Sequence, residues 1–489
     1  MKPYTRIILL TIICTLSLLS FSQKFTQEQL QEDVTYFFDK IEKIHVNPNF
    51  RYSKQEIDSL ELEILNQVYP MDVTEFSIWL MPKVNYLFDG HTGLEGEFCR
   101  KFLGPKKDKG LVLNFGEKAL NDTRDTLFLE LKEQILKHHK HGKYPLFSAG
   151  NIPVYNLINY TEKSIASDFR KPHKWKVSDQ LGETIALLVE YDTILPVEIL
   201  VNGSVVQDTI VFANRNNETS QAKQEQTSAS VEYKNEFQIW EDTNTAIFYL
   251  RTCNRNVFKE DEYLMLLDVF FDSVANSEIQ HLFIDVKDNG GGDSKYALML
   301  LDYICSEKQV IKVDESISKG SEELFRRNTN YFAKQLNLTR QSEVDSLYLL
   351  IACDTNFNKP YPYRWGIEPK DKVFEGEVYV LQSCNTFSAP ISLCATAKYY
   401  NFATLVGAET GGLTQTYIDC VIQQLPNSRM MFCSSSKYSS YVGSEPFKGV
   451  VPDIQYQFDQ SKKGDDVYYM TLDELKSIIE KYQKYDILN

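Results

Sequence analysis

A repeated strand–loop–helix pattern in the second half of the chain constrains its fold more than any other feature. Four short apolar runs, each typical of a buried strand, are separated by loops and helices: 246–250, 282–286, 378–381 and 405–407. Amphipathic helices are predicted between them, at 260–274 and 388–399. Strands that alternate with helices form a parallel sheet. We therefore predict an α/β core over residues 236–460, interrupted by an insertion at 316–370, and a C-terminal helix within 461–489.

The stretch from residue 23 to residue 100 has the pattern of a helical domain. Three polar pairs with capping-box spacing each precede an amphipathic run: Thr26 and Gln29, Ser53 and Glu56, and Asp72 and Glu75. A capping box satisfies two backbone N–H groups at a helix start, so each pair predicts where a helix begins.

Residues 101–235 predict a mixed α/β middle domain. Its expected elements are a polar helix near 130–138 and strands at 127–129, 185–201 and 204–211. The dipeptide Asn202-Gly203 between the last two strands is a hairpin signal. Residues 214–230 contain no large apolar side chain and predict a flexible linker to the core.

The first 22 residues have the layout of a secretory signal peptide. Two basic residues precede an uncharged, mostly apolar run over 7–21, and Ser20 and Ser22 place small side chains before a cut at Gln23. The alternatives are an uncleaved anchor, although a span needs roughly 20 apolar residues, and acylation of Cys14. We expect export to the periplasm, the cell envelope or the exterior, with no membrane span left after the signal is removed.

Charge and histidine spacing exclude several classes of function. The chain has 52 Lys and Arg against 67 Asp and Glu, a net charge of -15, and a protein that binds nucleic acid through its overall field should be basic. The histidines at 138, 139 and 141 have no carboxylate or cysteine spaced to complete a metal site. We therefore predict no nucleic-acid partner, no metal and no cofactor.

Two strand-to-helix junctions carry the candidate chemistry. At 285–292 a buried strand ends in three consecutive glycines, which can turn backbone N–H groups toward an anion or a developing oxyanion. The spacing does not fit a dinucleotide fingerprint, and a plain tight turn is the alternative. At the second junction Ser388 opens a helix, where the positive end of the helix dipole favours an alkoxide. A simple N-cap is the alternative there.

In this order and spacing the junctions resemble the tail-specific (C-terminal processing) serine peptidases. The closer resemblance is to the branch that includes the tricorn core and the interphotoreceptor retinoid-binding protein. The matching segments are 284–292, 380–389, 406–412, 425–428 and 449–454 in the core, and 44–48 and 88–92 in the helical domain. The resemblance implies a ClpP/crotonase-like core, and residues 157–161 are loosely similar to a PDZ-like module.

The resemblance also implies hydrolysis of polypeptide substrates by a serine nucleophile. Carried over position by position, Ser388 is the nucleophile. The N–H of Ala389 and one N–H of the three glycines, that of Gly291, form the oxyanion hole.

The general base implied by the resemblance is a histidine. Many tail-specific peptidases carry a lysine where this chain has Leu413, so a Ser–Lys dyad is not available. The tricorn-like arrangement uses a histidine of the helical domain, and His91 matches it. Glu445 is the candidate that orients the imidazole.

Two other functions remain open from the sequence. The missing lysine is compatible with a catalytically inactive relative that binds a ligand or peptide in the envelope. A crotonase-like acyl-CoA enzyme would share the core shape, but export and the missing nucleotide signals disfavour it.

Overall fold

The computed structural model describes residues 24–95, 119–212, 234–317, 338–353, 361–458 and 469–486, with gaps at 122, 131–134 and 140–142, and isolated residues between these ranges. The expected signal peptide (1–22) and the expected linker (214–230) lie outside the described residues. Three sheets and the helices around them give the mixed α/β fold that was predicted.

The N-terminal part is helical, as its capping pattern predicts. It comprises α2 (Gln27–Ile44), α3 (Lys54–Gln67), α4 (Val73–Val84) and the short helix η1 (Asn85–Leu87). All three capping boxes are present, with Thr26, Ser53 and Asp72 as the N-cap residues. Each box pairs backbone N–H groups that the helix leaves unsatisfied.

The middle part is built on a sheet in the order β2-β4-β6-β7-β3, with β5 beside β4. Its elements are β2 (Leu127–Glu130), β3 (Ile135–Leu136), β4 (Lys143–Ala149), β5 (Ile152–Pro153), α6 (Val154–Ser164), α7 (Lys174–Leu188), β6 (Ile194–Val201) and β7 (Ser204–Val211). The hairpin prediction is confirmed, because β6 and β7 pair around Asn202 and Gly203, both at positive φ.

Two predictions for the middle part are wrong. The strand expected from residue 185 begins only at Ile194, because residues 185–188 complete α7. Val177, Leu181 and Ile185 repeat every four residues and are fully buried, so they form the inner face of a helix. The helix expected near 130–138 is replaced, where it is described, by β3, which extends the sheet at the edge of β7.

The C-terminal core holds a sheet in the order β17-β14-β13-β10-β9-β8. Five of these strands are parallel, which confirms the prediction, and β8 is an antiparallel edge. The elements are β8 (Glu236–Trp240), η3 (Glu241–Thr243), β9 (Thr245–Tyr249), α8 (Glu260–Ala275), β10 (His281–Asp285), α9 (Ser294–Leu298), α10 (Leu301–Ile304), β13 (Glu377–Gln382), α13 (Ala389–Tyr400), β14 (Thr404–Gly407) and β17 (Ile454–Gln455). Apolar clusters cover both faces, and α14 (Leu472–Asp486) packs on one of them.

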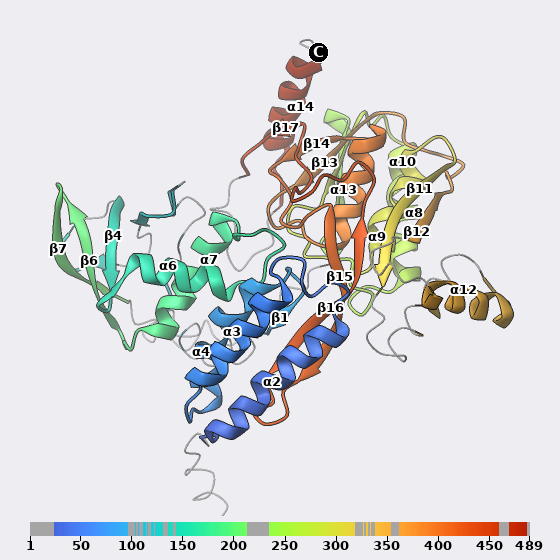
Figure 1. Cartoon of the computed structure of the whole chain (residues 1–489). Helices are drawn as coiled ribbons and strands as arrows, with labels where there is room; N and C mark the ends of the chain where they lie inside the picture. Colours follow the sequence, from blue (N-terminus) through green and yellow to red (C-terminus); the bar gives the residue numbers. More distant parts are fainter. Residues whose placement is uncertain are drawn as a thin grey trace, which may run out of the picture.

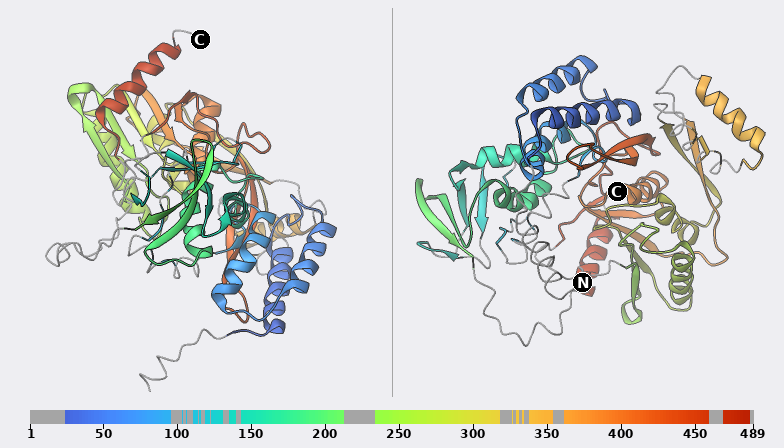
Figure 2. Two further views of the ribbon diagram at one scale, coloured as in Figure 1. Left: turned by 90° about the vertical axis from the view of Figure 1, so that its left-hand side faces the viewer. Right: turned by 90° about the horizontal axis from the view of Figure 1, so that it is seen from below.

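A second sheet connects the core to the N-terminal helices. It comprises β1 (Gly93–Leu94), β11 (Gln309–Ile317), β12 (Tyr361–Ile367), β15 (Gln415–Gln424) and β16 (Met431–Ser440), while α12 (Gln341–Cys353) lies between β11 and β12 in sequence. Strand β1 follows the helices directly and pairs with β16. Figure 1 shows β15 and β16 beside the blue helices, and in the right-hand view of Figure 2 the middle sheet stands on the other side of the molecule from β11, β12 and α12.

None of the helices in the described part of the chain combines the length and the apolar character needed to cross a membrane.

A buried carboxylate joins helix α2 to the tip of the β15–β16 hairpin. Asp33 is fully buried and accepts the backbone N–H groups of Asn427 and Ser428, each at 2.8 Å. Leu425, Met430 and Phe432 around this tip belong to the same apolar cluster as α2. The hairpin is therefore held at its far end by the N-terminal helices.

We expect Asp33→Ala to lower the free energy of unfolding by about 2–3 kcal/mol, because two buried N–H groups lose an ionic acceptor. Denaturant unfolding measures the change. Asp39→Ala on the same helix is the control, since Asp39 only makes an exposed pair with Lys43 and its loss should cost under about 0.5 kcal/mol. Equal stability of the two variants would contradict the role of Asp33.

Candidate active site

Two loops that follow neighbouring parallel strands meet at one edge of the core sheet. Strands β10 and β13 pair in register, with Asp285 opposite Leu381 at their carboxyl ends. The loop after β10 contains the three glycines and is called the glycine loop (286–292) below. The loop after β13 leads to Ser388. Ligand sites of parallel sheets lie at this edge because both loops open there.

Ser388 occupies a strained turn immediately before α13. Its φ is 64° and its ψ is -116°, an unusual backbone conformation for a residue that is not glycine. Such a strand-to-helix turn pushes a serine hydroxyl outward at the helix start. Its side chain caps no helix N–H, which removes the plain N-cap interpretation. Within the described residues, no hydrogen bond is formed by the N–H of Ala389, the first helical residue.

The glycine loop packs directly against Ser388. A Cβ added at Gly291 would lie 2.7 Å from the Cβ of Ser388 and 3.2 Å from its Oγ, and the φ of Gly291 is 115°. Both facts require glycine at this position. The Gly291 N–H donates to Oδ1 of Asn289 at 2.8 Å, so in this state it is not free for an oxyanion.

Asn289 ties the glycine loop to both neighbouring segments. Its side-chain amide donates to the carbonyl of Leu250 at 2.9 Å, and its backbone carbonyl accepts the N–H of Phe387 at 3.0 Å. Asn289 is fully buried, so each of these bonds is shielded from water. The asparagine therefore fixes the distance between the glycines and the residue that precedes Ser388.

His91 reaches this region from the N-terminal part. Its ring stacks on that of Phe387, the neighbour of Ser388, with centroids 4.6 Å apart and an interplanar angle of 26°. The loop that carries it, residues 88–92, is called the histidine loop. The Nδ1 atom of His91 is buried and has no hydrogen-bond partner, and it lies 4.0 Å from Oδ1 of Asp89.

Asp89 holds the histidine loop in place. Its carboxylate accepts from Nε2 of His45 at 2.8 Å, from Oγ of Ser435 at 2.9 Å and from the N–H of His91 at 2.7 Å. Burial alone would raise the pKa of Asp89. The hydrogen bond and the charge of His45, with help from His91, outweigh burial and lower that pKa to about 2. Asp89 is therefore ionised beside His91 at neutral pH.

Asp168, which the sequence analysis did not single out, lies in the same cluster. It belongs to the loop between α6 and α7 of the middle part, and burial and the nearby Asp89 raise its pKa while His91 opposes the rise. One ligand atom from each of Asp89, His91 and Asp168 lies within 4.8 Å of the others, close enough to hold a metal ion. The backbone N–H and hydroxyl donors already on both carboxylates favour a hydrogen-bonded cluster over a metal site.

The position of Glu445 does not support the role expected for it. Its carboxylate forms an exposed ion pair with Lys448. The carboxylates that the structure brings to His91 are those of Asp89 and Asp168 instead. Leu413, at the position of the missing lysine, donates its backbone N–H to Asp168 at 3.3 Å. At this position the backbone of the core therefore binds a carboxylate of the middle part.

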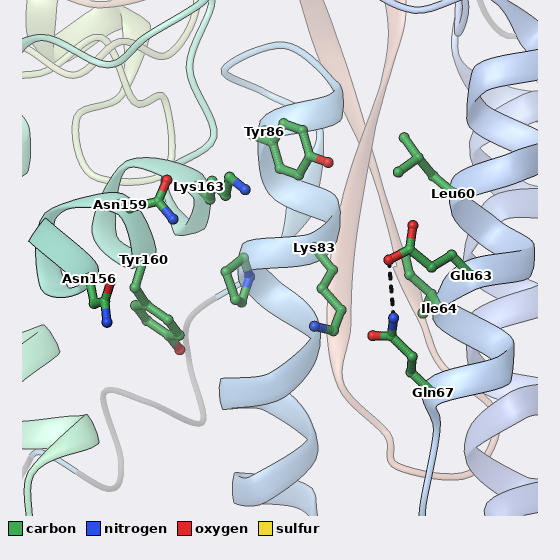
Figure 3. Close-up of a pocket in the computed structure, with 11 residues that line it drawn as sticks. Leu60, Glu63, Ile64, Gln67, Lys83, Tyr86, Asn156, Asn159, Tyr160 and Lys163 are labelled. Atoms are coloured by element: carbon green, nitrogen blue, oxygen red, sulfur yellow. Dashed lines mark hydrogen bonds between the residues drawn. The ribbon is translucent and has the colours of Figure 1, made fainter. Parts of the chain in front are cut away.

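Among the described residues, a small hollow and a larger one can be compared as binding places. One, of about 180 Å³, adjoins the histidine loop, and its lining includes Asp89, Asp168, Leu413, Tyr417 and Phe447. The other, of about 390 Å³, lies between α3, α4 and α6, where Lys83, Tyr86 and Tyr160 face it (Figure 3). Among the described residues that line the second hollow there is no serine, cysteine or histidine, so only the first adjoins candidate catalytic groups.

Comparison with known proteins agrees with this geometry. Residues 258–456 match the model of peptidase family S41. Mature CPAF has the same fold, with a TM-score of 0.57 and 11% sequence identity over 89% of this chain and 94% of that one. CPAF complexed with lactacystin gives a TM-score of 0.56 and 11% identity over 94% and 98% of the two chains. A putative S41 protease from Bacteroides fragilis is 12% identical, with a TM-score of 0.35, over 79% and 90%. No curated protein matches the sequence significantly.

An α/β core of this kind, matched by a peptidase model across the glycine loop and the loop that leads to Ser388, defines a serine-type hydrolase of peptide bonds. The region 258–456 thus belongs to peptidase family S41, the tail-specific peptidases.

The contact between Gly291 and Ser388 makes a sharp prediction. Gly291→Ala should lower the free energy of unfolding by about 1–3 kcal/mol, because the new methyl group meets Ser388 and the backbone is held at positive φ. Gly290→Ala is the neighbouring control, since a Cβ there meets nothing within 4 Å. Thermal unfolding of both variants is the measurement, and a Gly290 variant that melts as low as the Gly291 variant would refute the contact.

Proposed function

We propose that this chain is an exported serine endopeptidase that hydrolyses polypeptides through an acyl-enzyme on Ser388, with His91 as the general base. The observation that carries the proposal is the position of Ser388. It lies in a strained turn at a helix start, in contact with a glycine loop and next to the ring on which His91 stacks. Strain of this kind, held by the surrounding packing, is typical of nucleophiles.

The reaction follows from these groups. Oγ of Ser388 bonds to the carbonyl carbon of the scissile peptide while His91 takes the hydroxyl proton. The tetrahedral intermediate then expels the amine, which receives that proton from His91, and leaves an ester on Ser388. A water molecule, deprotonated by His91, hydrolyses the ester and restores the hydroxyl. General-base help of this kind is worth about 10²–10⁴-fold in rate.

The oxyanion hole in this proposal combines the N–H of Ala389 with an N–H of the glycine loop. The Ala389 N–H lies at the positive end of α13, where negative charge is stabilised. If Gly291 supplies the second donor, its bond to Asn289 has to be exchanged for the oxyanion when substrate binds. The site would then be completed only in the presence of substrate.

The organisation that accompanies this function is also a proposal. Residues 23–100 would be the helical domain, 101–235 a PDZ-like middle domain and 236–460 a ClpP/crotonase-like catalytic core, followed by a C-terminal helix within 461–489. The five parallel strands support the crotonase-like assignment of the core. A sheet flanked by α6 and α7, with its own apolar cluster, supports an independent middle domain.

A fluorophosphonate probe tests the catalytic assignment, because only an activated serine beside oxyanion donors reacts readily with it. We expect labelling of the wild type, none of Ser388→Ala, and a rate about 10²–10⁴-fold lower for His91→Ala at an unchanged melting temperature. His281→Ala is the control, since His281 begins β10 at the end opposite to the glycine loop. An unlabelled wild type would favour the inactive, ligand-binding relative, and full labelling of His91→Ala would show a structural histidine.

Export is tested at the N-terminus. Protein recovered from the cell envelope or medium should begin at or near Gln23, because Ser20 and Ser22 meet the small-residue requirement of signal peptidase. Edman sequencing or mass spectrometry of the N-terminal peptide measures this. Recovery of Met1, or of a chain that begins with acylated Cys14, would reject cleavage at this site.

A further inference from the structure

The carboxylate of Asp168 is held by donors from outside its own part of the chain. It is 4% exposed and accepts the N–H of Gly90 at 2.8 Å, the hydroxyl of Thr416 at 2.9 Å and the N–H of Leu413 at 3.3 Å. Gly90 belongs to the histidine loop, and the other two donors belong to the core. One side chain of the middle part thus bridges the two segments that enclose the candidate active site.

The backbone around Asp168 is fastened as well. The guanidinium of Arg51 donates to the carbonyls of Ser167 and Asp168, both at 2.8 Å, and to that of Tyr86 at 3.1 Å. Arg51 lies just before α3, so it anchors the loop between α6 and α7 to the N-terminal helices. A Cβ at Gly90 would lie 2.9 Å from Oδ1 of Asp168, so glycine is required for this approach.

Among the side chains of this cluster, the imidazole of His91 has a ring nitrogen without a hydrogen-bond partner. Its Nδ1 is buried and unpaired, and the oxygens of Asp89 already serve His45, Ser435 and the His91 N–H. Asp168 approaches the same imidazole from the middle part, with a carboxylate oxygen within 4.8 Å of a ring nitrogen of His91. Its two oxygens accept three donors, as an ionised carboxylate does, and a carboxylate at that distance can orient the imidazole.

We propose that Asp168 is a positioning residue for His91, supplied by the middle part, so that the base is oriented only while the loop between α6 and α7 is docked. The inference rests on the proposed role of His91 as the base. When His91 takes the Ser388 proton, the carboxylate of Asp168 stabilises the imidazolium. The ring becomes neutral again when it passes the proton to the leaving amine.

Other charged groups share this environment and bear on its pH dependence. The Nζ atom of Lys176, at the start of α7, lies 5.9 Å from the centroid of the Phe387 ring. Burial lowers the pKa of Lys176, and the charge of Asp168 only partly opposes this. In the described part of the chain, the charged or titratable groups around His91 and Asp168 include Asp89 of the histidine loop, Arg51, Arg170, Lys176, Tyr417, Tyr438 and Cys420.

The test is the pH profile of fluorophosphonate labelling of the full chain. Asp168→Asn keeps the side-chain size and removes the charge, so we expect the labelling rate at neutral pH to fall about 10–10²-fold. The loss should appear in the limiting rate, with the probe concentration for half-maximal rate within about twofold of wild type. Removal of a negative charge beside the proposed base should also move the acid limb of the labelling profile to lower pH.

The matched control is Asp208→Asn. Asp208 is a buried carboxylate of the same middle part, but it lies in β7 and pairs with His139, which follows β3. Its loss should lower the melting temperature without moving the acid limb. Thr416→Val covers the case in which Asp168→Asn fails to fold. It keeps the carboxylate but removes one donor, and it should shift the acid limb in the same direction by less.

The outcomes separate the two proposals. The inference is overturned if Asp168→Asn melts at a lower temperature but keeps the wild-type acid limb and limiting rate, because Asp168 then has only a structural role. If Asp168→Asn does not fold, the same result for Thr416→Val overturns the inference. If His91→Ala loses labelling while those profiles stay unchanged, the inference alone fails. If His91→Ala labels normally, the base assignment fails and the inference fails with it.

Discussion

The arrangement of the candidate active site depends on one buried hydrogen-bonded cluster, centred on the carboxylate of Asp89. Its carboxylate receives a side-chain bond from the end of α2, another from β16 and a backbone bond from the loop it belongs to. Leaving a buried donor or acceptor without its partner costs about 1–3 kcal/mol, so these bonds hold the histidine loop in place. Asn289 acts similarly on the other side of Ser388, where it binds the carbonyl of Leu250 and the N–H of Phe387.

The parts of the fold that local sequence controls were predictable. Each capping box starts a helix at the residue expected, and the apolar runs before Gly290 and Ser388 are buried parallel strands. Pattern failed where a tertiary partner decides the structure. The run from residue 185 reads equally as a strand or as the last turn of α7, and only packing of Ile185 beside Leu181 selects the helix.

The same limit applies to the site. Ser388 and Gly291 stand in segments whose order along the chain resembles a known family, so sequence alone could propose them. Asp168 has no such signal: it is a single carboxylate in a polar stretch, and its partners lie far away at Gly90 and Thr416. The one available hint was the glycine at position 90, whose missing side chain makes room for the carboxylate. Glu445 shows the converse, because proximity in sequence to a matching motif did not bring it to His91.

The spacing of the site along the chain has a consequence for biosynthesis. His91, Asp168, Gly291 and Ser388 are separated by long stretches, and each is carried by a different segment of the fold. A nascent chain emerges from its N-terminus, so the histidine loop leaves the ribosome well before the serine. The strand that holds Asp89 through Ser435 comes later still. A partly synthesised chain therefore cannot assemble the candidate site, and the order of synthesis delays its formation until nearly the whole polypeptide has been made.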